Sequence, residues 1–101
     1  MSVNIEFGFR VTNIADEAQA QAVITELREL MRDEGIGDQV RMAVEEEDGA
    51  CLVVGETVFP LIVSRSYLWC PEFEKSFAWY VKEAAPAATG VLEWNYPDEE
   101  Y

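Results

Sequence analysis

The sequence predicts an α+β fold, with two helices packed on one face of a mostly antiparallel sheet of four or five strands. Segments with alternating apolar residues, typical of strands, occur near both ends of the chain and in its middle. Two segments with apolar residues every three or four positions, typical of helices, separate them. The chain of 101 residues is 50% hydrophobic, which suffices for one domain over residues 1–97, followed by a short acidic tail at 98–101.

Residues 3–12 form the first predicted strand, because their odd-numbered positions are apolar and their even-numbered positions are polar or glycine. The first helix is expected over residues 16–34. Asp16 can accept a hydrogen bond at the helix N-terminus, with Gln19 placed as in a capping box. Gly35 is expected to end this helix. Its apolar stripe contains Ala20, Val23, Leu27, Leu30 and Met31.

The middle of the chain is expected to contribute two or three strands. Residues 40–46 carry apolar side chains on one face. Residues 50–54 are apolar on both faces, as in a central strand. The run Glu45–Gly49 is expected to form the turn between these strands, since it ends in Asp-Gly.

A further turn is expected at Gly55 and Glu56, where a two-residue hairpin with glycine first fits the sequence. It would lead into a strand over residues 57–64, in which Pro60 indicates a sheet edge or a bulge. If this turn does not form, the order reduces to β-α-β-β-α-β. That order resembles the split β-α-β motif of ferredoxin-like folds. The resemblance lies in the order of elements alone, and the fold it implies hosts unrelated functions.

The second helix is expected to begin at Pro71, a residue favoured in the first helical turn, and to end near Ala85, before Pro86. A last strand follows over residues 91–96, which gives the full order β-α-β-β-(β)-α-β. The predicted buried stripe of the second helix contains Phe73, Phe77, Tyr80, Val81 and Ala84.

The charge of the chain excludes several classes of function. Twenty acidic residues stand against seven basic ones, with no histidine, for a net charge of −13. Direct binding of nucleic acid or of an anionic membrane depends on clustered Lys and Arg, which this chain lacks. The absence of histidine excludes Ser-His and Cys-His catalysis and His-bound metals. No cofactor or metal is expected, since Glu45–Gly49 also lacks the ligand spacing of a calcium loop.

The two cysteines, Cys51 and Cys70, have neither a zinc-binding nor a redox-motif spacing. With no signal peptide or membrane-spanning run in view, a cytoplasmic protein with reduced thiols is expected, and a Cys51–Cys70 disulfide is the open alternative. Cys70 precedes Pro71 at the predicted N-terminus of the second helix, where the pKa of a thiol is lowered. Without a histidine to act as base, it is a weak candidate nucleophile.

Acidic residues are concentrated in the second part of the chain. Up to residue 44, eight acidic residues stand against four arginines, whereas from residue 45 onward twelve stand against three basic residues. Four of the twelve are consecutive, Glu45–Asp48. Two interpretations are open for this run: an anionic prong that binds a basic partner, or a solvated hairpin tip that keeps the sheet edge soluble. The excess charge favours a functional role, although a generally acidic proteome would also explain it.

Aromatic residues, concentrated in the last third of the chain, are the second candidate feature. Trp69 is expected on a loop before the second helix, and Trp79 in the core. Trp94 and Tyr96 share one face of the last strand and are the candidate anchors for a partner, because Trp and Tyr dominate interface hot spots. For Trp94, burial in the core is an equally open alternative.

These features favour a non-enzymatic, acidic inhibitor of a basic partner, such as a nuclease, a toxin or another nucleic-acid-binding effector, through imitation of nucleic-acid charge. An immunity protein or antitoxin, and a phage inhibitor of a defence system such as an anti-CRISPR, have this general character. The alternative is a small regulatory or ligand-binding module, dimerising through its sheet. The predicted contact residues are Glu45, Glu46, Glu47, Asp48, Glu93, Trp94, Tyr96, Asp98, Glu99 and Glu100.

Overall fold

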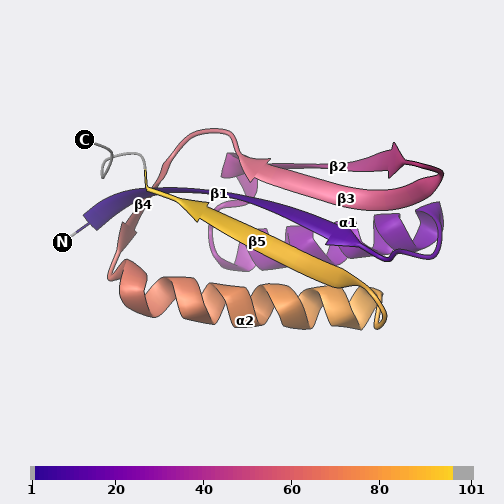
Figure 1. The fold of residues 1–101 in the computed structure, drawn as a ribbon. Helices are drawn as coiled ribbons and strands as arrows, with labels where there is room; N and C mark the ends of the chain where they lie inside the picture. Colours follow the sequence, from indigo (N-terminus) through magenta and orange to yellow (C-terminus); the bar gives the residue numbers. More distant parts are fainter. Residues whose placement is uncertain (1, 97–101) are drawn as a thin grey trace.

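The computed structural model describes residues 2–96 and confirms the predicted α+β architecture (Figure 1). Five strands form one antiparallel sheet, and two long helices pack against it. The tail predicted at residues 98–101 lies outside the described part of the chain. In chain order the elements are β1 (Ser2–Thr12), α1 (Glu17–Asp33), the 3₁₀ turn η1 (Gly37–Gln39), β2 (Val40–Glu47), β3 (Ala50–Thr57), β4 (Leu61–Ser64), α2 (Ser66–Ala84) and β5 (Thr89–Asn95).

The long strand β1 organises the sheet. Its residues from Glu6 to Thr12 pair with β5, and those from Gly8 to Val11 also pair with β3, which in turn pairs with β2. The sheet therefore has the order β5-β1-β3-β2, and the short β4 pairs with the first residues of β1. Phe7 lies between the part of β1 that pairs with β3 and the part that pairs with β4. There the hydroxyl of Thr57 donates a hydrogen bond to the carbonyl of Phe7 (3.4 Å) and accepts one from the N–H of Phe7 (3.3 Å).

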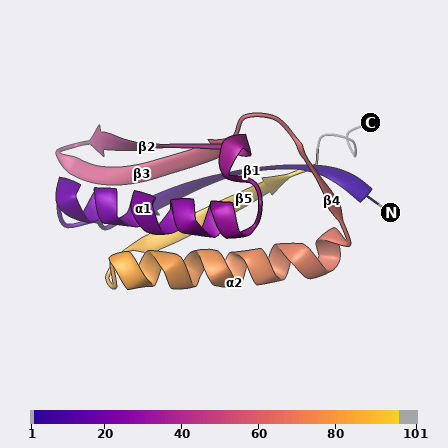
Figure 2. The ribbon, with the colours of Figure 1, turned by 180° about the vertical axis from the view of Figure 1, so that it is seen from behind.

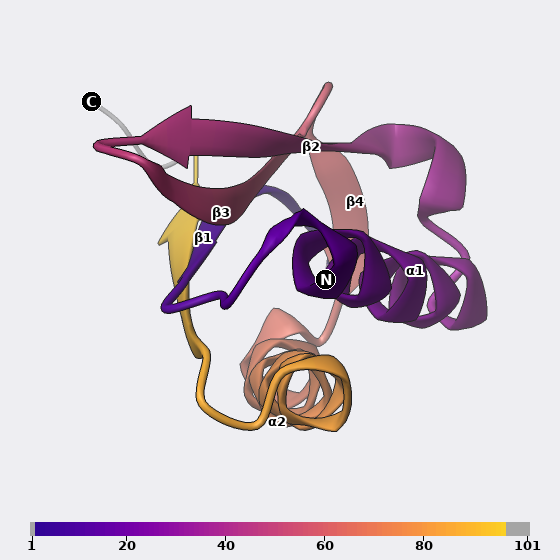
Figure 3. The same cartoon turned by 90° about the vertical axis from the view of Figure 1, so that its right-hand side faces the viewer.

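Both helices lie on the same face of the sheet. The view from behind shows α1 in front of the strands and α2 below them (Figure 2). The view turned by 90° shows the curved sheet on one side and the two helices on the other (Figure 3). Among residues 2–96, no element covers the opposite face. The side chains that point away from the helices are therefore open to a partner.

The predicted ends of α1 are confirmed. Asp16 caps the helix, its Oδ1 accepting a 2.8 Å hydrogen bond from the N–H of Gln19. The side chain of Gln19 reaches back to the N–H of residue 15, one position before that of a standard capping box. At the other end, Gly35 takes a φ of +75°, which lets Ile36 donate to a carbonyl of the last helical turn.

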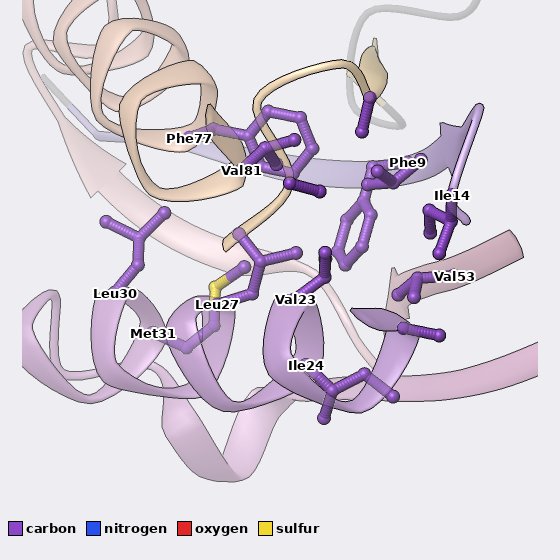
Figure 4. Packing of buried hydrophobic residues seen from close by; sticks show 14 of the residues in the cluster. Phe9, Ile14, Val23, Ile24, Leu27, Leu30, Met31, Val53, Phe77 and Val81 are labelled. Atoms are coloured by element: carbon purple, nitrogen blue, oxygen red, sulfur yellow. The ribbon is translucent and has the colours of Figure 1, made fainter. Parts of the chain in front are cut away.

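The core lies between the sheet and the two helices (Figure 4). The odd-numbered residues of β1 from Ile5 to Val11 are buried, and so are the predicted stripe of α1 and, in addition, Ile24. Phe9 from β1 meets Phe77 from α2 at a ring-centroid distance of 5.1 Å. Within the predicted stripe of α2, Phe73, Phe77 and Val81 are buried, whereas Tyr80 and Ala84 are half-buried.

The turn predicted at Gly55 and Glu56 is wrong, because both residues lie inside β3. Gly55 pairs with Phe9 and with Met42, so it faces the helices from the middle of the sheet. The ring of Phe9 occupies the space of the missing side chain: a Cβ atom on Gly55 would lie 2.2 Å from Cζ of Phe9. Glycine is thus present here to admit an aromatic ring and not to form a turn. The next strand, β4, begins only after Pro60.

The predicted start of the second helix is also wrong, since α2 begins at Ser66 and contains Pro71 in its interior. Arg65 adopts a left-handed φ of +55°, and its carbonyl accepts hydrogen bonds from two N–H groups of the first turn. Trp69 is therefore helical and stacks on Phe73 at a centroid distance of 4.8 Å. The free energy gained by burying this apolar surface offsets the cost of the helical hydrogen bond that Pro71 cannot make.

Candidate functional site

The open face of the sheet carries the candidate site. Residues paired directly across antiparallel strands project to the same face of a sheet. The register places Glu93 of β5 beside Gly8 of β1, Gly8 beside Glu56 of β3, and Glu56 beside Arg41 of β2. A row of one basic and two acidic side chains, interrupted by a glycine, therefore crosses the face that no helix covers.

A hollow of about 610 Å³ lies above Gly8. Side chains from three strands surround it, and glycine leaves its floor bare. A Cβ atom on Gly8 would come no closer than 3.5 Å to the carbonyl oxygen of Gly55, an ordinary contact, so packing does not demand glycine at this position. We call this feature the acidic hollow, because its ionisable lining residues are three carboxylates and one guanidinium: Glu6, Glu56, Glu93 and Arg10.

The three carboxylates of the acidic hollow differ in their partners. Glu56 Oε1 accepts a 2.6 Å hydrogen bond from Arg41, and Glu6 Oε1 accepts one of 2.7 Å from Asn95. The carboxylate of Glu93 makes no hydrogen bond or ion pair within residues 2–96. Since neighbouring strands lie about 4.8 Å apart, the Cα atoms of Glu56 and Glu93 are separated by roughly 10 Å across β1. A guanidinium or ammonium group entering between them can interact with both carboxylates.

The one basic residue in the lining, Arg10, points its charge out of the acidic hollow. It forms an ion pair with Glu47, with 3.2 Å between Nη2 and Oε2. Because β3 lies between β1 and β2, this ion pair crosses β3 and passes above Leu52. Leu52 is a buried residue of the open face and does not belong to the main core. Arg10 therefore neutralises Glu47 and leaves Glu93 uncompensated.

The acidic run Glu45–Asp48 does not form a single prong. The turn is shorter than predicted: β2 continues through Glu47, and only Asp48 and Gly49 turn the chain, with φ of +52° and +81°. Both values suit a two-residue hairpin of type I′, so strand pairing extends to the tip. Along a strand, successive side chains alternate between faces. Glu45 and Glu47 consequently share the open face, whereas Glu46 projects to the helix side.

The predicted residues on the last strand lie on two different faces. Glu93 belongs to the acidic hollow. Trp94 pairs with Phe7, so its ring lies on the helix side, half-buried against Phe73 at a centroid distance of 5.9 Å. Tyr96 is half-buried, with its hydroxyl 3.9 Å from Sγ of Cys70. The predicted contact residues Asp98, Glu99 and Glu100 lie outside the described part of the chain.

Two aromatic predictions on α2 are wrong. Trp69, expected on a loop, is a helical residue packed against the core. Trp79, expected in the core, is 58% exposed and contacts Tyr80 edge-on at 5.0 Å. The buried face of α2 includes Phe77, and a residue two positions further along points about 200° around the helix, toward solvent.

Cys70 also departs from its prediction. It is the fifth residue of α2 and so lies beyond the first helical turn. Burial raises the pKa of its thiol, and a hydrogen bond with Tyr96 opposes this rise. The thiol is therefore protonated near neutral pH, which makes it a poor nucleophile. Cys51 and Cys70 are both free. Within residues 2–96 no group of three or more Cys, Asp or Glu side chains is arranged to hold a metal ion.

Other carboxylates serve the fold by accepting hydrogen bonds from aromatic side chains. These bonds connect α1 with α2, and α2 with β5, at the solvent-facing rim of the core. The hydrogen bond to Asp33 is the main cause of a raised pKa of Tyr80. The three pairs are Tyr80 with Asp33 (3.1 Å), Trp69 with Glu34 (2.9 Å) and Trp94 with Glu74 (2.8 Å).

The sequence interpretation missed two of the three carboxylates of the acidic hollow, Glu6 and Glu56. Alternation along residues 3–12 already indicates that Glu6, Gly8 and Arg10 share one polar face. The sequence around Glu56 predicts a turn, and its position beside Gly8 depends on the register between β1 and β3.

A separate question is whether the chain could cross a membrane. Neither of the two described helices, α1 and α2, is long and apolar enough to do so.

No protein-family model matches the sequence, and no curated protein matches it. Solved structures with the same architecture are similar to it. The de novo designed protein Foldit4 has a TM-score of 0.59 and 14% identity, over 94% of this chain and 97% of that one. The designed protein LFR1, described as having a ferredoxin fold, has a TM-score of 0.55 and 12% identity, over 98% and 91% of the two chains. A dimeric ferredoxin-like protein from an uncultured marine organism has a TM-score of 0.54 and 9% identity, over 97% and 99%. The likeness shows a ferredoxin-like fold.

Proposed function

We propose that this chain is an acidic inhibitor that binds a basic segment of a partner protein on the open face of its sheet. The acidic hollow above Gly8 is the observation that carries this proposal. There Glu93 is uncompensated, Glu6 and Glu56 flank it, and no described element covers them. The partner class is one that handles nucleic acid, because such proteins present clustered Arg and Lys for phosphate groups.

The apolar side chains around the acidic hollow suit the same partner. Val54 and Val91 line it together with the carboxylates, and Val91 is half exposed. Arg and Lys pack their aliphatic stems against apolar surface while their charged ends reach polar groups. An inserted basic side chain would thus gain apolar contacts as well as ionic ones. Long-range attraction to a chain of net charge −13 would accelerate the encounter.

The biological settings proposed for this activity are an immunity protein or antitoxin bound to its toxin, and a phage-encoded inhibitor such as an anti-CRISPR. In either setting, we propose that the chain occupies the cationic surface that would otherwise receive nucleic acid. The carboxylates of the open face would take the place of phosphate groups on that surface.

A regulatory module that dimerises through its sheet is the second candidate, because one structural neighbour is described as dimeric. The charges on the open face oppose this arrangement. Five carboxylates and two arginines project from it, so two copies set face to face would repel one another. The five carboxylates are Glu6, Glu45, Glu47, Glu56 and Glu93.

Capture from an extract of the native host, at low and at high salt, tests the proposed function. The immobilised chain is expected to retain a basic, nucleic-acid-binding protein at about 50 mM salt and to release most of it at about 500 mM, since salt screens exposed charges. The purified partner is then assayed for binding or cleavage of nucleic acid, which the chain is expected to inhibit. A captured protein that is not basic, or one whose activity the chain leaves unchanged, would contradict the proposal.

A further inference from the structure

A second surface of the molecule is apolar. Of the seven large apolar side chains that are exposed in residues 2–96, five come from an eleven-residue stretch, residues 58–68. The stretch comprises the connection from β3 to β4, β4 itself and the first turn of α2, at the end of the molecule opposite the β2–β3 hairpin turn (Figures 1 and 2). We call it the end patch, and its members are Val58, Phe59, Ile62, Tyr67 and Leu68.

The end patch is large enough for a specific interface. Its five side chains are between 46% and 78% exposed. At roughly 200 Å² for a large side chain, their exposed parts amount to about 600 Å². That area is at the upper end of the largest patch on an ordinary monomer, about 300–600 Å², and approaches the roughly 800 Å² that each partner buries in a standard interface. Beside the patch lies a hollow of about 470 Å³, whose lining includes Phe59, Ile62 and Trp69 together with one acidic residue, Glu34. This hollow can receive a partner's side chain.

Charge identifies the occupant of the end patch. Residues 57–71 contain no Asp or Glu and a single basic residue, Arg65, in a chain with a net charge of −13. Arg65 is exposed and forms no ion pair within the described residues. Across most of the surface, a second copy would bring many carboxylates against carboxylates. The end patch itself contains none, and Glu34 is the one acidic residue that lines the hollow beside it. The apolar area, the absence of acidic groups and the unpaired arginine together fit another copy of the same chain.

We infer that the protein forms a two-fold dimer in which the end patch of one copy packs against that of the other. The end patch and the acidic hollow share no lining residue. The proposed dimer contact therefore uses none of the residues that line the acidic hollow. This inference does not depend on the proposed function, since it rests on the apolar end of the molecule alone.

Sedimentation velocity over a range of concentrations tests the inference. Tyr67→Ser and Ile62→Ser, at side chains 75% and 78% exposed, are each expected to weaken dimerisation at least tenfold, because each substitution counts twice across a two-fold axis. The matched controls are Trp79→Ser and Val91→Ser, at exposed apolar residues outside the patch. Trp79 lies about 18 Å further along α2 than Tyr67. The controls are expected to leave the dimer unchanged, and circular dichroism confirms that each variant is folded.

Salt dependence separates this dimer from binding at the acidic hollow. Raising the salt concentration is expected to strengthen an apolar contact between two acidic chains, because it screens their repulsion. Binding of a basic partner is expected to weaken under the same change. The inference is overturned by a chain that stays monomeric up to about 1 mM, at which ordinary specific dimers are populated. It is equally overturned by controls that weaken the dimer as much as the patch variants do.

Discussion

Replacing Gly55 with alanine is expected to lower the free energy of unfolding by about 3 kcal/mol, toward the upper end of the usual cost of overpacking a core. The added Cβ would lie 2.2 Å from Cζ and 2.3 Å from Cε2 of Phe9. Phe9 is buried between the sheet and Phe77, so its ring cannot move aside without opening the core. Urea unfolding followed by tryptophan fluorescence measures the effect, as a lower midpoint at an unchanged slope.

Gly8→Ala is the matched control for this substitution. Gly8 lies in the neighbouring strand of the same sheet but faces the open side, where a Cβ atom would have a normal 3.5 Å contact. Alanine at Gly8 is expected to leave stability unchanged or to raise it by up to about 1 kcal/mol, because glycine is unfavourable within strands. If both substitutions destabilised the protein equally, or neither did, the role assigned to the Phe9 ring would be wrong.

Replacing the three carboxylates of the acidic hollow with glutamine is expected to weaken binding of the basic partner by roughly 100-fold or more. Coupling between close charges across an interface is typically about 1.5 kcal/mol or greater, and each 1.4 kcal/mol corresponds to about tenfold in affinity. The loss of Glu56 also frees Arg41, which would then repel an incoming cation. Surface plasmon resonance with the captured partner measures the dissociation constants of the wild type and of Glu6→Gln/Glu56→Gln/Glu93→Gln.

A second triple variant, Glu17→Gln/Glu72→Gln/Glu83→Gln, controls for the change in net charge. These three exposed residues lie on the helices, and one of them, Glu72, forms an ion pair with Lys75 as Glu56 does with Arg41. Both variants carry the same total charge, so long-range attraction is reduced equally. The control is expected to weaken binding less than about fivefold, through slower association alone. Equal losses in the two variants would show that net charge, and not the acidic hollow, governs recognition.

The fold class and the order of elements were predictable because they depend on local periodicity. The alternation of β1, the stripe of α1 and the caps at Asp16 and Gly35 are encoded within a few neighbouring residues, and the structure confirms them. The predicted end of β3 and the predicted start of α2 were wrong, because contacts between residues distant in sequence determine these boundaries. Gly55 by itself indicates a turn, but in the structure it lies within a strand and leaves room for the ring of Phe9, which is distant in sequence. Pro71 by itself indicates the start of a helix, but Trp69 stacks on the core residue Phe73, and α2 begins five residues before Pro71, at Ser66.

The candidate site was predictable only in part, for a related reason. Charge counting identified acidic clusters along the chain, such as Glu45–Asp48, but hairpin geometry distributes that run over two faces and a turn. The acidic hollow instead draws one carboxylate from each of three strands, Glu6, Glu56 and Glu93. Their proximity arises from the register of β1 with β3 and β5, which depends on long-range pairing. Of these residues, only Glu93 belongs to the predicted contact set.

Titration of the ¹⁵N-labelled chain with a short arginine-rich peptide, followed by amide chemical shifts, tests the central proposal most directly. The largest shifts are expected at the three strand segments around the acidic hollow, residues 6–10, 54–56 and 91–95, and they should fade as salt is added. Gly8→Val, which fills the floor of the hollow, is expected to reduce them. Shifts centred instead on the Asp48–Gly49 turn, or spread evenly over both helices, would contradict recognition by the acidic hollow.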